Sequence, residues 1–199
     1  MRTLAISTAS PALSLALFDG DRLLAHDHRI IGRGHAEALL PAIIALMGDT
    51  RADRIIVDNG PGSFTGIRIG IAAARALGFA WGVPVTGCEG GSLVAARAFA
   101  LRSDVAGVTI FLDAGRGQVL HQRIARDFTA SPITTIAPDA VIAAVVAAPG
   151  EATAGPLSPA GHIHDGQPDT AFALHLPLPA RSLSPTALYV RPPDAILPL

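Results

Sequence analysis

The order of apolar and polar residues predicts an α/β fold that opens with three strands. Residues 4–6 form a short apolar run, and a polar turn follows at residues 7–11. From Leu13 to Leu17 a leucine recurs at every second position, which is the period of a strand. Asp19-Gly20 is a two-residue hairpin signal, and residues 22–28 return as another strand. The chain is therefore predicted to begin as a three-stranded meander.

A helix is predicted next, because apolar residues recur at helical spacing. They are Ala36, Leu39, Leu40, Ile43, Ile44 and Met47. Pro41 lies within this stretch, so it must either fall in the first turn or kink the helix. Residues 54–58 (R-I-I-V-D) then read as a buried strand.

The elements that follow complete a recognisable order. A glycine-rich loop at residues 59–65 leads into a helix at 66–81, a short strand at 83–85 and a helix at 92–101. The order βββαβα is that of a ribonuclease H-like lobe, with a mixed sheet and crossover helices on its faces. We expect this lobe to span residues 1–104.

The second part repeats the start of the first. Strands are predicted at residues 108–112 and 118–126, joined by a polar turn, as in residues 3–28, which makes an internal duplication plausible. Residues 138–148 can form a helix with Pro138 in its first turn. Because proline is frequent from residue 149 to 184, we expect mostly loops there. The expected second lobe, residues 105–199, is smaller than the first.

Composition describes a globular chain of 199 residues, half of them hydrophobic and 16% charged. With a net charge of −1, the chain as a whole does not attract nucleic acid electrostatically. If RNA is involved, we expect a partner protein to supply most of the binding affinity. There is no lysine, which excludes a Walker lysine and a Schiff base. One cysteine, Cys88, excludes an intramolecular disulfide. No leader or membrane-length segment is evident, so we expect a cytoplasmic protein.

The loop before the second helix has two interpretations. Its sequence is G-P-G-S-F-T-G, and backbone N–H groups at a helix start attract anions. The functional interpretation is a phosphate cradle formed by Gly60, Gly62, Ser63 and Thr65. The structural interpretation is that Ser63 or Thr65 caps the helix and the glycines permit tight turns.

The second helix carries small residues at every fourth position. They are Gly66, Gly70, Ala74, Gly78 and Gly82, and together they form a ridge with almost no side chain. Each interior glycine costs about 1 kcal/mol relative to alanine, so the ridge needs a compensating reason. Close approach of another helix is one, because interaxial distance depends on the side chains at the crossing. That neighbour can belong to this chain or to another subunit.

Other candidate residues have ordinary structural explanations. The segment His162-Ile163-His164-Asp165 has two alternate histidines, but it lies in a proline-rich stretch without further ligands and reads as a solvated loop. His35 begins an amphipathic helix, and Asp113 and Arg116 lie in a predicted hairpin turn. Cys88 lacks a histidine nearby in sequence that could activate it as a nucleophile.

Several blocks resemble the TsaB (YeaZ) family. G-P-G-S-F-T-G-I-R-I-G at residues 60–70 is the most specific, and G-R-G-H-A-E-A-L-L-P-A-I at 32–43 is similar to the family's first helix. F-L-D-A-G-R-G-Q-V at 111–119 and A-L-Y-V-R-P-P-D-A at 187–195 are similar to its second hairpin and its C-terminal signature. The blocks occur in the family's order and span nearly the whole chain. The resemblance implies the two-lobed actin/hexokinase/Hsp70-like fold, which agrees with the pattern above.

The resemblance also implies a function. TsaB proteins pair with the catalytic subunit TsaD and with the ATPase TsaE to make N6-threonylcarbamoyladenosine at position 37 of tRNA. TsaB itself is not catalytic, holds no cofactor or metal, meets tRNA only through the complex, and can form homodimers when alone. The implied interface is on the first and second helices, at Leu39, Ile43, Gly66, Ile67, Gly70, Ile71, Ala74 and Gly78.

Two sequence features bear on catalysis. Where the catalytic paralogue has H-M-E-G-H, this chain has G-C-E-G-G at residues 87–91, and glycine cannot ligate a metal through a side chain. Residues 7–9 are Ser-Thr-Ala where the family usually has Asp-Thr-Ser, so the acid that would hold a nucleotide's magnesium is absent. Two alternatives stay open: an ATP-dependent phosphotransferase of the actin/hexokinase type, which ATP turnover would reveal, and a metallopeptidase, which stoichiometric metal would reveal.

Overall fold

The first sheet has five strands and contains the predicted meander. The computed structural model describes residues 1–146 and 152–190. Its strands are β1 (Arg2–Ser7), β2 (Ala12–Asp19), β3 (Arg22–Ile30), β4 (Arg54–Asp58) and β5 (Val85–Cys88). Their order across the sheet is β3-β2-β1-β4-β5, with β1 antiparallel to β2 and parallel to β4. The sheet is therefore mixed, as the sequence predicted.

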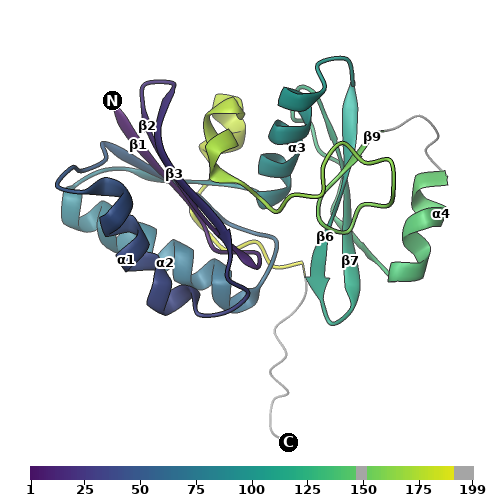
Figure 1. Ribbon diagram of the computed structural model, residues 1–199, viewed down its shortest axis with the longest axis horizontal. Helices are drawn as coiled ribbons and strands as arrows, with labels where there is room; N and C mark the ends of the chain where they lie inside the picture. The colour runs from purple at the N-terminus through teal and green to yellow at the C-terminus, as the bar shows by residue number, and fades with distance from the viewer. Residues whose placement is uncertain (147–151, 191–199) are drawn as a thin grey trace, which may run out of the picture.

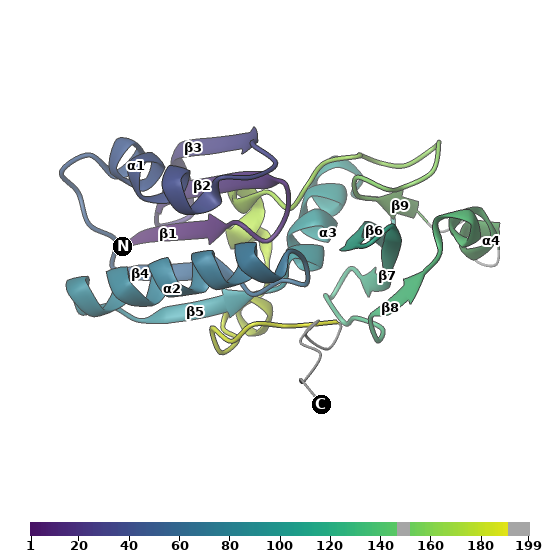
Figure 2. The same ribbon diagram turned by 90° about the horizontal axis from the view of Figure 1, so that it is seen from below.

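Helices cover both faces of this sheet (Figures 1 and 2). On one face, α1 (His35–Met47) and α2 (Phe64–Trp81) lie side by side and pack on apolar residues of β1 and β2 such as Leu4 and Leu15. On the opposite face, α3 (Gly90–Leu101) packs on Ala5, Phe18 and Ile56. Because neighbouring residues of a strand point to opposite faces, each strand contributes to both cores.

The second sheet repeats the strand order of the first with one strand fewer. Its strands are β6 (Gly107–Gly115), β7 (Gln118–Ala125), β8 (Thr134–Ile136) and β9 (Ala152–Ala154), ordered β8-β7-β6-β9. As in the first sheet, the opening pair is antiparallel and the crossover pair, β6 and β9, is parallel. The helix predicted from residue 138 is a 3-10 turn, η1 (Pro138–Ala140), followed by α4 (Val141–Val146). Its predicted last two residues lie outside the described part of the chain.

The fold is thus the two-lobed α/β architecture of actin, hexokinase and Hsp70, with a reduced second lobe. Helix α3 joins the lobes, since Leu93 and Ala96 pack on the first sheet while Val94, Ala95 and Ala98 pack on β6 and β9. No helix within the described residues is both long enough and apolar enough to cross a bilayer.

The last part of the described chain returns to the first sheet. The 3-10 helix η2 (Thr170–His175) contacts β1, β2 and β3, and η3 (Leu178–Arg181) contacts β5. Leu183 then forms a bridge with Gly87. The division of the chain at residue 105 stays a prediction, and these contacts show that residues 170–183 pack with the first lobe.

Some local predictions were inaccurate. β5 begins at Val85 rather than Val83. Of the two alternatives for Pro41, the structure excludes the first turn, since Pro41 lies further inside α1. The apolar stripe predicted for α1 is wider than the buried face, because Leu40 and Ile44 are 51% and 69% exposed. Strands β8 and β9 were not predicted.

Candidate functional site

The glycine-rich loop forms the start of α2. Ser63 is the N-cap, and its hydroxyl accepts a hydrogen bond from the Gly66 N–H at 3.2 Å, as one of the structural interpretations expected. Gly60 has φ +98°, where a side chain would be strained, and a Cβ there would fall 2.6 Å from Ile67 Cδ1. The loop residues are thus accounted for by turn geometry and capping.

The glycine ridge of α2 packs against its own chain. A Cβ on Gly66 would collide with the carbonyl oxygen of Thr8, and one on Gly78 would collide with Val85. At Gly70 it would lie 2.6 Å from Thr8 Oγ1, whose hydroxyl donates to the Gly66 carbonyl at 2.7 Å. The neighbour that requires Gly66, Gly70 and Gly78 is therefore the β1–β2 turn and the sheet, whereas Gly82 is the exposed C-cap of α2, with φ 68°.

The predicted docking residues belong to the same packed layer, and their part in an interface stays a prediction. All eight of them are buried in this chain: Leu39, Ile43, Gly66, Ile67, Gly70, Ile71, Ala74 and Gly78. Those with side chains help to build the core between the helices and the sheet. Large side chains at these positions, as in Gly70→Leu or Ala74→Trp, would disrupt this core.

The exposed side of the same two helices includes apolar residues, beside charged ones such as Glu37, Arg68 and Arg75. Its apolar members, which we call the outer face, are Leu40, Ile44, Ala72, Ala76 and Phe79, all exposed. Phe79 is 93% exposed and Ile44 69%. Exposed aromatic and branched aliphatic side chains gathered on adjacent helices are typical of a protein interaction surface.

The charged residues of α2 beside the outer face fold back onto this chain. The Arg68 guanidinium lies 3.7 Å from the centre of the Phe64 ring, and Arg68 Nε donates to Tyr189 Oη at 2.8 Å. Arg75 donates to the Pro185 carbonyl at 2.8 Å. These contacts hold the arginine side chains against the C-terminal segment, which leaves the outer face poor in charge.

A cavity of about 1040 Å³ lies where the first turns of α1 and α2 face the β6–β7 hairpin. Gly62, Ser63 and Thr65 line it, together with Arg33 and other residues of both lobes. A helix N-terminus beside arginine is a suitable environment for an anion. The phosphate interpretation of the loop therefore stays a prediction; Gly60 does not line the cavity, and its carbonyl instead accepts a hydrogen bond from the Gly90 N–H.

A buried carboxylate lies at the end of β4, and sequence reasoning missed it. Asp58 is 1% exposed, and it accepts hydrogen bonds from Ser7 Oγ at 2.7 Å and from the Gly60 N–H at 2.8 Å. Burial raises the pKa of Asp58 to about 6, against the opposing effect of these hydrogen bonds. Ser7, which occupies the position where the family usually has an acid, is thus a donor to an acid on the neighbouring strand.

We expect this carboxylate to make stability depend on pH. Its pKa in the folded chain, about 6, exceeds the ordinary 3.8, so folding favours the protonated form and stability falls as pH rises from about 4 to about 6. The gap corresponds to at most about 3 kcal/mol. Asp58→Asn stays neutral, so its unfolding free energy, measured in urea from pH 4 to 7, should lose most of this slope. Parallel curves for variant and wild type would contradict the assignment.

The segment that replaces the paralogue's metal-binding motif is tightly packed. A Cβ on Gly87 would collide with the Asn59 amide, and one on Gly91 would lie 3.1 Å from Gln122 Oε1. Burial raises the pKa of the Cys88 thiol well above its usual value, and burial also raises the pKa of Glu89. The thiol is therefore protonated at neutral pH, which makes it a poor nucleophile.

The remaining histidine candidates have structural partners. His164 is buried rather than solvated, which corrects the loop interpretation; its Nε2 lies 3.0 Å from the Val94 carbonyl, and its Nδ1 accepts from Gly166 N. His162 Nδ1 lies 2.9 Å from the Pro159 carbonyl. His35 is buried with Nε2 3.3 Å from the Ala12 carbonyl, as expected of a structural residue.

The hairpin turn of the second lobe also follows its predicted chemistry. Asp113 Oδ1 accepts from Gly115 N at 2.7 Å, and Arg116 has φ 54°. Both Asp113 and Arg116 line the cavity described above.

The fold and these sites define a class of protein, and comparison with known families agrees. The family model described as TsaD, tRNA N6-adenosine threonylcarbamoyltransferase, matches residues 29–178, more than half of the chain. The chain belongs to this family. Within it, the chain is one of the TsaB/YeaZ proteins, as the glycine-rich loop and the relatives below indicate.

Curated relatives include two proteins named tRNA threonylcarbamoyladenosine biosynthesis protein TsaB. The Escherichia coli protein is 33% identical over 132 residues, 64% of this chain and 56% of its own length. The Bacillus subtilis protein is 31% identical over 124 residues, 60% of this chain and 53% of its own. An uncharacterized protein of Mycobacterium tuberculosis is 40% identical over 91 residues, 42% of this chain and 43% of its own. The chain spans about half the length of the curated relatives it matches.

Solved structures share the whole fold. YeaZ from Pseudomonas aeruginosa superposes with a TM-score of 0.76 over 95% of this chain and 99% of that one, at 24% identity. A second Pseudomonas aeruginosa structure, described as similar to peptidase YEAZ, gives 0.77 over 96% and 99%, also at 24% identity. At this identity the agreement concerns the fold alone.

Proposed function

We propose that this chain is a non-catalytic subunit that binds and activates TsaD in the complex that makes N6-threonylcarbamoyladenosine at position 37 of tRNA. The observation that carries the proposal is the apolar outer face of α1 and α2. A side chain such as Phe79, 93% exposed, gains about 25 cal/mol for each Å² of apolar surface that a partner covers.

The packing around residues 87–91 supports a non-catalytic role. A metal-binding histidine in place of Gly87 would need the space that the Asn59 side chain fills. Cys88, the one cysteine of the sequence, is 2% exposed and held as a thiol by burial. These residues are suited to packing and not to transfer chemistry.

TsaD is the partner we favour over a second copy of the chain. The family model that the chain matches is that of TsaD, and two of its relatives are named as tRNA threonylcarbamoyladenosine biosynthesis proteins, which favours a partner from the same modification system. Homodimers remain an outcome of the test, formed when TsaD is absent.

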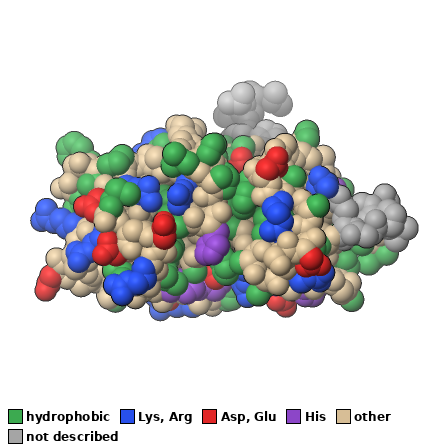
Figure 3. Space-filling model, turned by 90° about the horizontal axis from the view of Figure 1, so that it is seen from above, with side chains coloured by type: hydrophobic (Ala, Val, Ile, Leu, Met, Phe, Trp, Pro, Cys, Tyr) green, Lys and Arg blue, Asp and Glu red, His purple; other side chains and the backbone are tan. Residues whose placement is uncertain are grey.

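tRNA is proposed to meet the chain only through the complex, which also includes TsaE and works in the cytoplasm. The formal charge is −1, and on the face shown in Figure 3 arginines and acidic residues are interspersed without one large patch of a single sign. Such a surface gives little of the phosphate neutralisation on which RNA affinity depends.

The test is reconstitution of the transfer reaction with TsaD and TsaE from the same organism. We expect TsaD to co-purify with this chain, and the modification of tRNA to require it. ATP turnover by the chain alone would favour the phosphotransferase alternative. Peptidase activity that depends on bound metal would favour the metallopeptidase alternative.

A further inference from the structure

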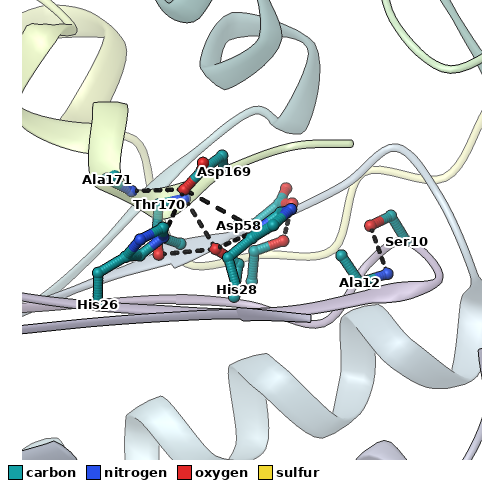
Figure 4. Close-up of polar contacts among 10 residues, drawn as sticks. Ser10, Ala12, His26, His28, Asp58, Asp169, Thr170 and Ala171 are labelled. Carbon is teal, nitrogen blue, oxygen red and sulfur yellow. Dashed lines mark hydrogen bonds and ion pairs between the residues drawn. The ribbon is translucent and has the colours of Figure 1, made fainter. Parts of the chain in front are cut away.

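Three side chains of types that bind transition metals meet on the far side of the first sheet from α1 and α2. His26 and His28 lie on β3, and Asp169 lies immediately before η2 (Figure 4). His26 Nε2 is 2.8 Å from Asp169 Oδ1, and His28 Nδ1 is 3.9 Å from the same oxygen. One ligand atom from each residue lies within 4.8 Å of the other two. Segments 143 residues apart in sequence thus converge on one point.

Local structure brings the three groups together. Residues two apart on a strand point to the same side, so the His-x-His pattern of β3 presents both imidazoles to η2. Their rings are stacked, with centroids 5.9 Å apart. Asp169 is held independently, because its Oδ1 accepts the Ala171 N–H at 2.9 Å as the N-cap of η2. The carboxylate is therefore positioned without help from the histidines.

We propose that His26, His28 and Asp169 bind one divalent transition-metal ion, for which Zn²⁺ is the best match. Two imidazole nitrogens and one carboxylate oxygen are a donor set that zinc accepts with water in the fourth position. Ligand atoms of a tetrahedral zinc site are about 3.3 Å apart, given bonds of about 2.0–2.1 Å. The separations of 2.8 and 3.9 Å bracket this value. The His26 side chain is 30% exposed, which gives solvent access to the fourth position.

The surrounding hydrogen bonds tolerate such an ion. Ser14 Oγ lies 3.0 Å from His28 Nδ1, and it also lies 3.0 Å from both the N–H and the hydroxyl of Thr170. If His28 Nδ1 turns to a metal, Ser14 keeps both partners on Thr170. A carboxylate oxygen has two lone pairs, so Asp169 can keep its cap and still bind an ion.

One nearby charge opposes the site. Arg97 on α3 acts electrostatically on His28 in the sense that disfavours a cation. The carboxylates of Asp169 and Asp27 act on His28 in the opposite sense and favour a cation. The donor set favours zinc, which binds imidazole strongly, over Mg²⁺, which prefers an all-oxygen set.

A bound ion would link η2, and with it the C-terminal segment that packs on the first sheet, to the edge strand β3. The alternative is that hydrogen bonds alone hold these three residues together, without a metal ion. His26→Gln separates these cases, because a glutamine amide can still donate to Asp169 whereas it is a poor zinc ligand. His175→Gln is the matched control, since His175 is an exposed histidine on η2 itself and lies outside the cluster.

The experiment uses the full chain without a histidine tag, stripped with EDTA and then dialysed against Zn²⁺, Mg²⁺ or buffer. We expect one zinc per chain by elemental analysis, no retained magnesium, and a rise in Tm of about 5 °C or more at zinc 100-fold above Kd. His26→Gln and His28→Gln should lose the zinc and the Tm shift, while His175→Gln keeps both. Co²⁺ in the wild type should give visible absorption bands that His26→Gln lacks.

Two results would overturn the proposal. One is a wild-type chain that retains no more zinc than His26→Gln. The other is stoichiometric zinc that persists unchanged in both β3 variants, which would put the ion elsewhere in the protein. Neither result bears on the pairing with TsaD, since the cluster lies across the sheet from the outer face.

Discussion

Replacing Gly70 with leucine is expected to destabilise the fold strongly. The new side chain must enter space that Thr8 and Val57 fill, since even its first carbon would lie 2.6 Å from Thr8 Oγ1 and 3.5 Å from Val57 Cγ2. Overpacking of this kind costs about 3 kcal/mol or more, a large part of a typical total stability of about 5–15 kcal/mol. Thermal unfolding followed by circular dichroism measures the loss.

Ala72→Leu is the matched control for this variant. Ala72 lies on the same helix but is exposed, so leucine there should change the unfolding free energy by about 0.5 kcal/mol or less. Gly66→Ala gives a second test, because the two explanations predict opposite signs for the change in unfolding free energy. Helix propensity favours alanine over glycine by about 1 kcal/mol, whereas collision with the Thr8 carbonyl predicts destabilisation. A stable Gly70→Leu or a stabilised Gly66→Ala would mean that the ridge does not face the sheet.

The second large effect is expected on binding. Ile44→Asp combined with Phe79→Asp should weaken the affinity for TsaD by about 100-fold or more, because each aspartate would have to be desolvated in an apolar interface. Folding should be unaffected, since the two side chains are 69% and 93% exposed. Titration calorimetry with purified TsaD gives Kd, and thermal unfolding verifies the fold.

A control for the binding variant comes from the second lobe. Ile142 on α4 is 61% exposed, so Ile142→Asp makes the same chemical change far along the chain from the outer face. We expect it to bind TsaD with the wild-type Kd. Equal weakening by Ile142→Asp and by the double variant would indicate a general effect of added charge rather than an interface on α1 and α2.

The sequence predicted the first lobe well because its signals are local and strong. Alternation from Leu13 to Leu17 and the Asp19-Gly20 turn specify the meander, and a capping serine at position 63 marks the start of α2. The strands β8 and β9 have only three residues each, too few for a period to be visible.

The spacing of the small residues in α2 does not show which neighbour they face. Small residues at every fourth position indicate close approach by a neighbour, but the spacing is the same whether that neighbour is another subunit or Thr8 of the same chain. The apolar stripe of α1 had a related ambiguity. Leu39 and Leu40 differ by one position, and one is buried while the other is exposed. The periodic pattern alone thus did not separate the residues that pack on the sheet from those that stay exposed.

The buried carboxylate and the histidine cluster were missed for a different reason. Asp58 is unusual only once Ser7 and the Gly60 N–H are known to surround it. The His-x-His pattern of β3 was visible in sequence, but its third member, Asp169, is 143 residues from His26. No local pattern relates groups so far apart.

The rate at which TsaD modifies tRNA, measured with this chain or its variants added, decides whether the outer face of α1 and α2 is the activating surface. We expect the wild-type chain and Ile142→Asp to restore full transfer, and the Ile44→Asp/Phe79→Asp chain to leave the rate at the level of TsaD without a partner. Full activation by the double variant, or modification of tRNA by this chain alone, would contradict the proposed role.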